Sequence, residues 1–590
     1  MRQFFKFMFA SMLGFLITCF ILIFLLIAAV SALLSSGNKD IVEIASNSVL
    51  KIELQDEIMD RASKNPFENF NFASFKTSHQ LGLNDILKDI KKAKTDENIS
   101  GIYLDLSSIP AGIATVEEIR NALIDFKTSK KFIVSYSEFF TQKSYYLASV
   151  SDQIYLNPAG AMDWKGLSTQ LLFFKGTLEK LEVEPEIIRH GKFKSAIEPF
   201  ILDKMSEANR LQTRTFVGSI WNHLVDGISE QRKIQRGELN RLASSLAINN
   251  AEDAISNKLI DKKLYYDEVV NELKKRIGLS ETDELSFISL RKYHSVPGIA
   301  HDKLSMDKIA VIFAQSNIES GEGDDNTIGS DKIAEAIRDA RLDKKVKAIV
   351  LRVNSPGGSA LASDVIWRET ILAKKAKPFV VSMGDLAASG GYYISCAADK
   401  IVASPNTITG SIGVFGLMMN IQKLMNNKLG ITIDTVNTNT HADFGSTYRA
   451  LTAEERAVMQ NSVERVYDDF ISKVAEGRHK TKAEIDSLGQ GRVWSGTDAL
   501  KLGLVDELGG LTKAIEVAAK LAKMENYRIS NLPKQKDALE KIMEDFSAEP
   551  ETKILKSELG QSYKYIQQIR SLARANKSIQ ARMEYTIDLY

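Results

Sequence analysis

Two halves of this chain repeat one another, and the repeat limits its fold more than any other feature. Residues 101–106 match residues 348–353 at an offset of 247, and residues 251–254 match residues 496–499 at an offset of 245. A chance alignment does not hold a nearly constant offset over so long a stretch. The chain is therefore expected to use one folding unit twice.

Within each copy, strand-like apolar runs alternate with helix-like segments. Residues 309–313 and 348–353 are predicted strands, and residues 331–340 between them form a plausible helix. Such alternation favours an α/β fold with mostly parallel sheets and flanking helices.

The repeat also sets the expected domain boundaries. The 590 residues are too many for one ordinary core, and a Pro-Gly turn within residues 295–304 separates the copies. We expect an N-terminal half over residues 45–300 and a C-terminal half over residues 305–530. Residues 531–590 lie beyond the repeat, are rich in charged and helix-forming residues, and are predicted to be a peripheral helical tail.

The N-terminus carries an apolar run without a charged residue, residues 7–34. Its 28 residues exceed the roughly 20 that span a bilayer. Arg2 and Lys6 precede the run, which predicts a cytoplasmic N-terminus over residues 1–6 and export of the remainder. The alternative is a signal peptide cleaved after Val30-Ser31-Ala32, but its apolar region would be only about 7–15 residues long. We therefore expect one uncleaved transmembrane helix.

Composition argues against two classes of function. With 76 basic and 75 acidic residues the net charge is +1, so nothing in the bulk charge indicates nucleic-acid binding. The seven histidines are scattered and form no metal-binding motif, so no metal or other cofactor is expected. Cys19 lies in the apolar run and Cys396 far from it, so no intrachain disulfide framework is expected.

Ser389 is the candidate nucleophile. A predicted strand, residues 379–383, runs through the turn Ala388-Ser389-Gly390-Gly391 into an apolar run. At such a strand-to-helix turn the hydroxyl faces a helix N-terminus, which favours negative charge, and the Gly390 amide is free to bind an oxyanion. The alternative is an ordinary helix N-cap serine.

A second turn, residues 354–359, follows another buried strand and contains Pro356-Gly357-Gly358. Its backbone amides carry no bulky side chains, which suits an oxyanion hole, although such a turn can also be purely structural. Ligands of open α/β sheets bind at the carboxyl ends of the strands, where both turns are expected.

The sequence indicates the general base less clearly than the nucleophile. No His/Asp pairing emerges from spacing. The repeat aligns Ser389 with Gln142, which cannot be a nucleophile, and Lys194 with His441. The halves have thus diverged where chemistry is expected, which is compatible with one half supplying the nucleophile and the other the base.

At this point the chain resembles a known family, signal peptide peptidase A in its long, duplicated form. The resemblance covers the N-terminal anchor, the tandem halves and four motifs in the same order. The motifs are Phe193-Lys194-Ser195-Ala196-x-Glu198-Pro199-Phe200, Val353-Asn354-Ser355-Pro356-Gly357-Gly358-Ser359, Gly384-Asp385-x-x-Ala388-Ser389-Gly390-Gly391-Tyr392 and Thr409-Gly410-Ser411-Ile412-Gly413.

The resemblance implies tandem crotonase-like domains related to Clp protease. It implies Ser389 as nucleophile, Lys194 as general base and Ser411 as the residue that orients the lysine. It further implies a homo-oligomer, tetrameric in the long form, on the outer face of the bacterial cytoplasmic membrane. The implied substrates are apolar peptides, including signal peptide remnants.

The implied mechanism needs a neutral Lys194. A free lysine has a pKa of about 10.4, and burial can lower that value by several units. Gly358 and Gly390, with Gly357 beside them, are expected to supply the oxyanion-hole amides. The alternative for Lys194 is an ordinary solvated lysine.

Two rival functions stay open at the level of sequence. One is a crotonase-fold enzyme acting on acyl-CoA thioesters, which would need neither Ser389, Lys194 nor an export anchor. The other is a membrane scaffold that keeps the fold without activity, which the intact set of Ser389, Lys194 and Gly357-Gly358 disfavours.

Overall fold

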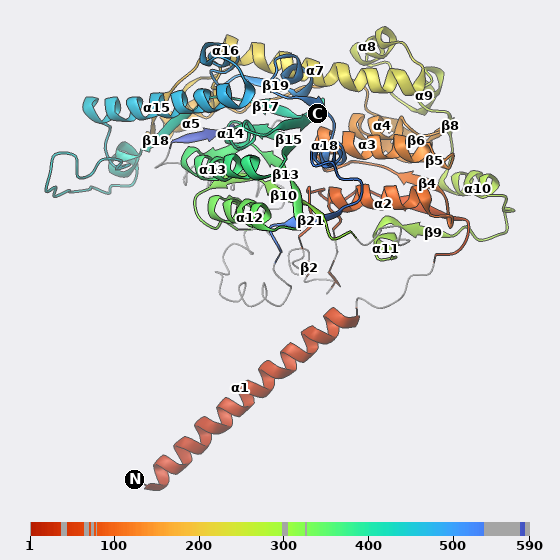
Figure 1. The fold of residues 1–590 in the computed structure, drawn as a ribbon, viewed down its shortest axis with the longest axis horizontal. Helices are drawn as coiled ribbons and strands as arrows, with labels where there is room; N and C mark the ends of the chain where they lie inside the picture. Colours follow the sequence, from red (N-terminus) through yellow and green to blue (C-terminus); the bar gives the residue numbers. More distant parts are fainter. Residues whose placement is uncertain are drawn as a thin grey trace.

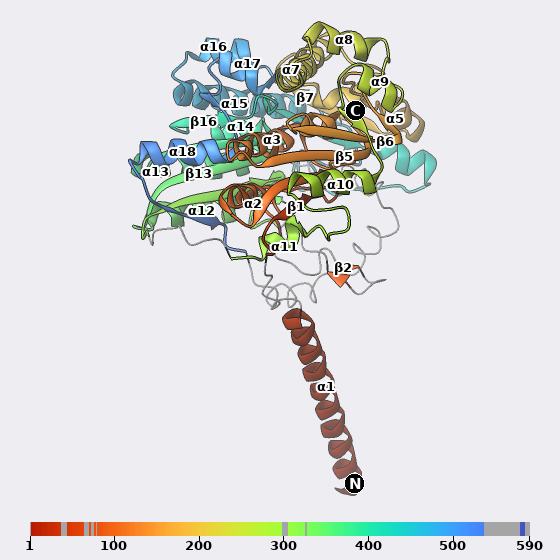
Figure 2. The ribbon, with the colours of Figure 1, turned by 90° about the vertical axis from the view of Figure 1, so that its right-hand side faces the viewer.

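The computed structural model describes most of the chain, as a body of sheets and helices from which one long helix projects (Figures 1 and 2). The described residues are 2–36, 44–63, 70–71, 76–77, 80–297, 305–324, 327–535 and 579–583. The projecting helix is α1 (Arg2–Ser36). Among the described residues it is the one helix long and apolar enough to cross a membrane, over Gln3–Leu22.

The N-terminal half is built on a six-stranded sheet in which every pair of neighbours is parallel. Val49, Ile102 and Val134 are fully buried, because helices cover both faces of a parallel sheet. The strands, in spatial order, are β8 (Lys262–Lys263), β6 (Gln153–Met162), β5 (Phe132–Phe140), β4 (Ile99–Asp105), β1 (Ser48–Ile52) and β9 (Phe287–Ser289). A separate pair, β2 (Phe70–Asn71) and β3 (Lys76–Thr77), is antiparallel.

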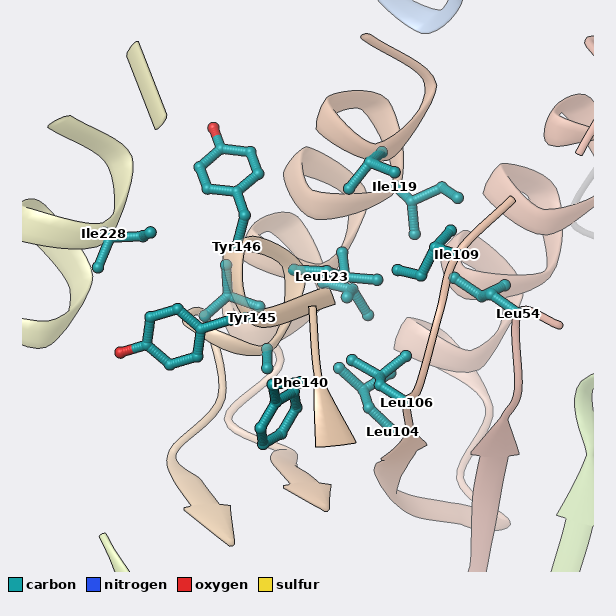
Figure 3. Packing of buried hydrophobic residues seen from close by; sticks show 14 of the residues in the cluster. Leu54, Leu104, Leu106, Ile109, Ile119, Leu123, Phe140, Tyr145, Tyr146 and Ile228 are labelled. Atoms are coloured by element: carbon teal, nitrogen blue, oxygen red, sulfur yellow. The ribbon is translucent and has the colours of Figure 1, made fainter. Parts of the chain in front are cut away.

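The helices of this half pack on the sheet through apolar side chains. Figure 3 shows Leu123 beside Leu104 and Leu106, and Tyr145 beside Phe140. The helices are α2 (Leu83–Thr95), α3 (Ile113–Lys127), α4 (Gln142–Ala148), α5 (Lys175–Leu181), α6 (Glu198–Ile201), α7 (Glu207–Arg232), α8 (Arg236–Ser244), α9 (Ala251–Ser256), α10 (Tyr266–Arg276), α11 (Leu290–His294) and a 3-10 turn, η1 (Ser195–Ile197).

The C-terminal half repeats this sheet, with an eight-stranded arrangement that is parallel except between β17 and β19. Its main path, in spatial order, is β19 (Val493–Ser495), β17 (Ile408–Gly410), β15 (Phe379–Ala388), β13 (Val346–Ser355), β10 (Lys308–Gln315) and β21 (Arg528–Leu532). Two further strands, β16 (Lys400–Ala403) and β20 (Glu507–Leu508), continue from β15.

The helices of the C-terminal half follow the same order as those of the first. They are α12 (Ser330–Leu342), α13 (Ala360–Ala376), α14 (Gly390–Ser395), α15 (Ala453–Arg478), α16 (Lys482–Leu488), α17 (Gly496–Lys501), α18 (Leu511–Leu521) and a π-helical turn, η2 (Leu424–Lys428). Strands β4 and β13 begin 247 residues apart, as do β5 and β15, and α9 and α17 begin 245 apart. The predicted repeat and the predicted α/β fold are confirmed.

A third sheet joins the two halves. Its spatial order is β12 (Thr327–Gly329), β11 (Asn317–Glu319), β14 (Gly357–Ser359), β22 (Gln580–Arg582), β18 (Phe415–Asn420) and β7 (Glu184–Arg189). Strand β7 belongs to the N-terminal half, yet it pairs antiparallel with β18 over six residues of the C-terminal half. The halves are therefore interleaved and do not lie as two separate bodies.

The segment predicted as a helical tail is described only in part, at residues 531–535 and 579–583. Neither part is helical, since the first completes β21 and the second forms β22. Backbone partners on β14 and β18 explain the second strand, because pairing in a sheet overrides a weak helix preference. The rest of the predicted tail lies outside the described residues.

Candidate active site

Ser389 lies in the sharp turn between β15 and α14. Its backbone has φ +56° and ψ −112°, in a region that residues with a side chain rarely adopt. The Ser389 amide donates to the Gly410 carbonyl at 2.8 Å, and the Tyr393 amide donates to the Ser389 carbonyl at the same distance. The strained turn is thereby held from both sides, as is common at functional sites.

Glycines let the second turn approach this one closely. A Cβ on Gly391 would lie 2.7 Å from the Ser355 carbonyl oxygen, and a Cβ on Gly357 would lie 2.6 Å from the Gly390 nitrogen. Gly357 also has φ +98°, which favours glycine. Larger residues would push the two turns apart.

The structure brings Lys194 to Ser389. The lysine Nζ lies 2.9 Å from Ser389 Oγ, 3.1 Å from Ser411 Oγ and 3.3 Å from the Ser411 carbonyl oxygen. Ser389 Oγ also lies 3.2 Å from the Gly413 carbonyl oxygen. Ser389, Lys194 and Ser411 are at most 2% exposed. The three predicted side chains, drawn from both halves, form one buried cluster.

Sheet pairing explains how Lys194 reaches the other half. Strand β7 ends at Arg189, which pairs with Phe415 at the start of β18. Beyond the strand, the Phe193 amide donates to the Gln490 carbonyl at 3.0 Å. A Cβ on Gly491 would lie 2.6 Å from the Lys194 Cα, so a glycine there makes room for the lysine backbone.

Sequence reasoning missed Gln212, a fully buried side chain on α7 that clamps the lysine loop. Its Nε2 donates to the Phe193 carbonyl at 3.1 Å and to Ser195 Oγ at 2.9 Å. Its Oε1 accepts from the Val493 amide at 3.2 Å. Gln212 thus ties both neighbours of Lys194 to the C-terminal half, and no motif in the sequence points to it.

Glu198 was part of the lysine motif without an assigned role, and the structure shows its contacts. The carboxylate is 1% exposed. It accepts from Ser206 Oγ at 2.5 Å and from Asn209 Nδ2 at 2.9 Å. Because buried carboxylates need such donors, this network fixes the turn that follows Lys194 to the start of α7.

The positions aligned with the cluster, Gln142 in the N-terminal half and His441 in the C-terminal half, form no comparable pair in the described structure. Gln142 uses its side chain to hold a loop, since its Oε1 accepts from the Lys165 and Gly166 amides at 3.0 and 2.8 Å. His441 bonds Glu455 at 3.0 Å, and this hydrogen bond raises the pKa of the imidazole. The described structure therefore holds the Ser/Lys cluster in one place.

A cysteine close to the nucleophile is not a rival for its role. Cys396 lies at the end of α14 and is fully buried, and burial raises the pKa of its thiol to about 12. A thiol with that pKa stays protonated at neutral pH and is a poor nucleophile. Among the residues that the structure describes, no group of three or more His, Cys, Asp or Glu side chains is placed to hold a metal.

Family models match both halves of the chain. The model for peptidase family S49 matches residues 124–280 and 371–525, and the model for Clp protease matches residues 302–409. The two S49 matches fall on the two copies of the repeat. The Clp match covers β10, β13 and β15, the strands that lead to the Ser389 turn.

Two named relatives match most of the chain, and a third matches part of it. Protease 4 of Salmonella typhi is 38% identical over 89% of this chain and 86% of its own length. The chloroplastic serine protease SPPA of Arabidopsis thaliana is 34% identical over 81% of this chain and 70% of its own. A putative signal peptide peptidase SppA of Enterococcus faecium is 35% identical over 38% of this chain and 63% of its own. The chain is therefore a serine protease that belongs to peptidase family S49.

Proposed function

We propose that this protease hydrolyses peptide bonds with Ser389 as nucleophile and Lys194 as general base. The observation that carries the proposal is the 2.9 Å separation of Lys194 Nζ and Ser389 Oγ, which is within reach of direct proton transfer. Burial favours the neutral form of an amine, and only the neutral form can accept the serine proton. Ser389 would attack the carbonyl carbon, and Lys194 would then protonate the leaving amine and activate the hydrolytic water.

We assign the oxyanion hole to the backbone amides of Gly358 and Gly390. Gly357 lies where the turns that hold these two residues meet. The close approach of Gly357 to the Gly390 nitrogen supports this assignment, because it brings the two turns to one point. Preorganised amides of this kind are worth about 10²–10³ in rate for each donor.

Substitution of either member of the dyad tests the proposal. We expect Ser389→Ala and Lys194→Ala to abolish hydrolysis of fluorescein-labelled casein by the full chain in detergent, and Ser395→Ala to retain it. Ser395 is a suitable control because it is a fully buried serine on α14 whose hydroxyl donates to the Gly391 carbonyl. Full activity in either dyad variant would refute the proposal, and a non-catalytic scaffold would show no serine-dependent hydrolysis at all.

We further propose that the protease is anchored by α1 and cleaves apolar peptides, including signal peptide remnants, outside the cytoplasmic membrane. The length and apolar character of α1 support the anchor, and Arg2 and Lys6 support a cytoplasmic N-terminus. The Enterococcus relative, a putative signal peptide peptidase, supports the substrate class. In intact spheroplasts, added protease should degrade the body of the chain. Full protection would contradict this orientation.

The chain is also proposed to form a homo-oligomer, with a tetramer as the expected size. Residues 429–448 supply the support, because this connection between η2 and α15 exposes several large apolar side chains. They are Leu429, Ile431, Ile433, Val436, Phe444 and Tyr448. An exposed apolar patch of this kind is typical of an interface. Replacing Ile433 and Val436 by Asp should reduce the oligomer mass measured by light scattering. An unchanged mass would exclude residues 429–448 as the interface.

A further inference from the structure

The turn at Gln490 and Gly491 contacts both the segment that carries the proposed base and the segment that carries the orienting serine. The Gln490 carbonyl accepts from the Phe193 amide, next to Lys194, at 3.0 Å. The Gly491 amide donates at 2.7 Å to the carbonyl of Ile412, which follows the orienting serine. A shift of this turn would therefore move Lys194 relative to that serine.

The turn has an unusual backbone that its surroundings must hold. Two consecutive residues are left-handed, with φ +52° at Gln490 and +83° at Gly491. Residues with a side chain rarely adopt such values, and they keep them only where neighbouring groups fix the chain. The hydrogen bond to the Gln490 amide is thus part of what keeps the turn in place.

Tyr467 on α15 makes that hydrogen bond. Its phenol oxygen accepts from the Gln490 amide at 3.1 Å and donates its proton to Asp486 Oδ1 at 2.6 Å. The side chain is only 3% exposed. Burial, together with the hydrogen bond to Asp486, raises the pKa of Tyr467, so the hydroxyl stays protonated and keeps both roles.

The ring of Tyr467 also contacts the lysine segment directly. It stacks on the imidazole of His190, with the ring centroids 3.8 Å apart and 24° between the ring planes. His190 bonds Glu464, three residues before Tyr467 on the same helix, at 2.6 Å. One tyrosine side chain therefore reaches the lysine segment twice, through its ring and through its hydroxyl.

The other copy of the repeat carries a related pair without the additional contact. Helices α7 and α15 begin 246 residues apart, as do α8 and α16, which aligns Tyr467 with Trp221. The same offset aligns Asp486 with Asn240, and Trp221 Nε1 donates to Asn240 Oδ1 at 2.8 Å. An indole N–H can only donate, whereas a phenol can also accept. Of the two aromatic residues, the tyrosine alone can join its helices and hold a turn as well.

We propose that Tyr467 is a positioning residue for the general base. The proposal rests on the Ser389/Lys194 mechanism. Tyr467 acts through His190 and through the turn at Gln490, which together fix the chain that leads into the lysine. Its contribution is to keep Lys194 Nζ at the 2.9 Å separation from Ser389 Oγ that proton transfer needs.

Steady-state hydrolysis of a fluorogenic peptide by the full chain in detergent tests the proposal. We expect Tyr467→Phe to lower kcat about tenfold with KM little changed, since misplacement of a catalytic group by 1 Å can cost about 10². Trp221→Phe is the matched control, because it removes the aligned hydrogen bond in the other copy, and it should keep the wild-type kcat. Thermal unfolding of each variant is measured in parallel.

Asp486 tests the same hydroxyl from its other side. Asp486→Asn keeps an acceptor for the phenol proton, whereas Asp486→Leu removes it. We expect Asp486→Leu to lower kcat as Tyr467→Phe does, and Asp486→Asn to lower it much less. Equal values of kcat in the two Asp486 variants would contradict the proposed role of the hydroxyl.

Lys194→Ala protein, assayed alongside, separates failure of this inference from failure of the proposed function. An inactive Lys194→Ala protein together with a wild-type kcat in Tyr467→Phe would overturn the role of Tyr467 and leave the dyad standing. An equal fall of kcat in Trp221→Phe, or a rise of KM at constant kcat in Tyr467→Phe, would overturn it as well. Full activity of the Lys194→Ala protein would overturn both proposals.

Discussion

At the scale of single residues, the surroundings of Lys194 Nζ account for its orientation. A neutral amine has two N–H groups and one lone pair. The Ser411 carbonyl oxygen and Oγ lie 3.3 and 3.1 Å from Nζ and can accept both N–H groups. The remaining direction then faces Ser389 Oγ, so in the proposed mechanism Ser411 helps to aim the lone pair at the hydroxyl that loses its proton.

Ser411→Ala should therefore lower kcat without a comparable change in KM. The amine keeps the carbonyl acceptor and loses the hydroxyl, so we expect a fall of about tenfold or more, below the 10²–10⁴ that general-base catalysis contributes in full. Steady-state peptide hydrolysis measures both constants. An unchanged kcat would exclude Ser411 as an orienting residue.

Gln212→Leu tests positioning at the other side of the lysine. The change keeps the size of the side chain but removes the hydrogen bonds to Phe193, Ser195 and Val493, so Lys194 loses its fixed approach. We expect kcat to fall about 10-fold to 100-fold with KM little changed, since misplacement of a catalytic group by 1 Å can cost about 10². A rise in KM at constant kcat would instead indicate a role in binding the peptide.

Single residues also show where sequence reasoning stopped. The small-residue turn around Ser389 is visible because local chemistry demands glycine there. Lys194 emerges from the sequence only through the repeat and the family motif, since a lysine is ordinarily a solvated side chain. Gln212 was missed altogether because its partners lie on other elements, and helical periodicity does not distinguish it from the rest of α7.

At the scale of elements, buried charges lock the two halves together. Arg352 on β13 is fully buried, and its Nη2 lies 2.7 Å from both Asp60 Oδ1 and Glu118 Oε1 of the N-terminal half. Asp385, on β15, accepts from the Ala114 and Thr115 amides at the start of α3. These contacts fix β13 and β15, the strands that carry both active-site turns, against α3.

Arg352→Met should destabilise the protein more than a surface substitution does. Removing the guanidinium leaves Asp60 and Glu118 buried without their cation, a change that costs about 3–5 kcal/mol. Thermal unfolding should show a clear fall in midpoint, and Arg338→Met on the half-exposed helix face serves as the control. Combining Arg352→Met with Asp60→Leu and Glu118→Leu should recover most of the loss. No recovery would mean that the three charges do not act as a unit.

Elements were predicted well where the repeat applies and poorly beyond it. Strands such as β13 and β15 are continuous apolar runs, typical of parallel strands covered on both faces. Strand β22 has only the residues Gln580, Ala581 and Arg582, which carry no strand preference. Its conformation depends on the open edges of β14 and β18, which come from distant parts of the chain.

At the scale of the whole molecule, the Ser/Lys cluster exists because strand β7 crosses into the sheet of the other half. Within the described residues the two copies hold one such cluster, with Gln142 and His441 at the aligned positions. The 2.9 Å contact between Lys194 and Ser389 lies within a single chain. The proposed dyad therefore needs residues of one molecule only, whatever the size of the oligomer.

Mixing two inactive variants tests whether the proposed dyad forms within one chain. Ser389→Ala protein combined with Lys194→Ala protein, dissociated and reassembled together, should stay inactive in casein hydrolysis because no chain holds both groups. Activity restored to an appreciable fraction of wild type would show that the dyad forms between neighbouring chains.

The pH dependence of hydrolysis is also a property of the whole molecule, because residues of both halves surround the proposed base, Lys194. A lysine base is active only when neutral, so kcat/KM should be low in acid and rise with pH until the amine is deprotonated. A histidine base would instead complete its rise near its ordinary pKa of about 6.5. A profile that is flat from acid to alkaline pH would contradict a lysine base.

The most direct test of the central claim is the site and rate of covalent labelling by a fluorophosphonate, followed by peptide mapping. The account predicts a single adduct on Ser389 in the wild-type chain, and labelling about 100-fold slower or more in Lys194→Ala protein, because the base no longer accepts the proton. An adduct on another residue, or equal rates in the two proteins, would contradict a Ser389/Lys194 dyad.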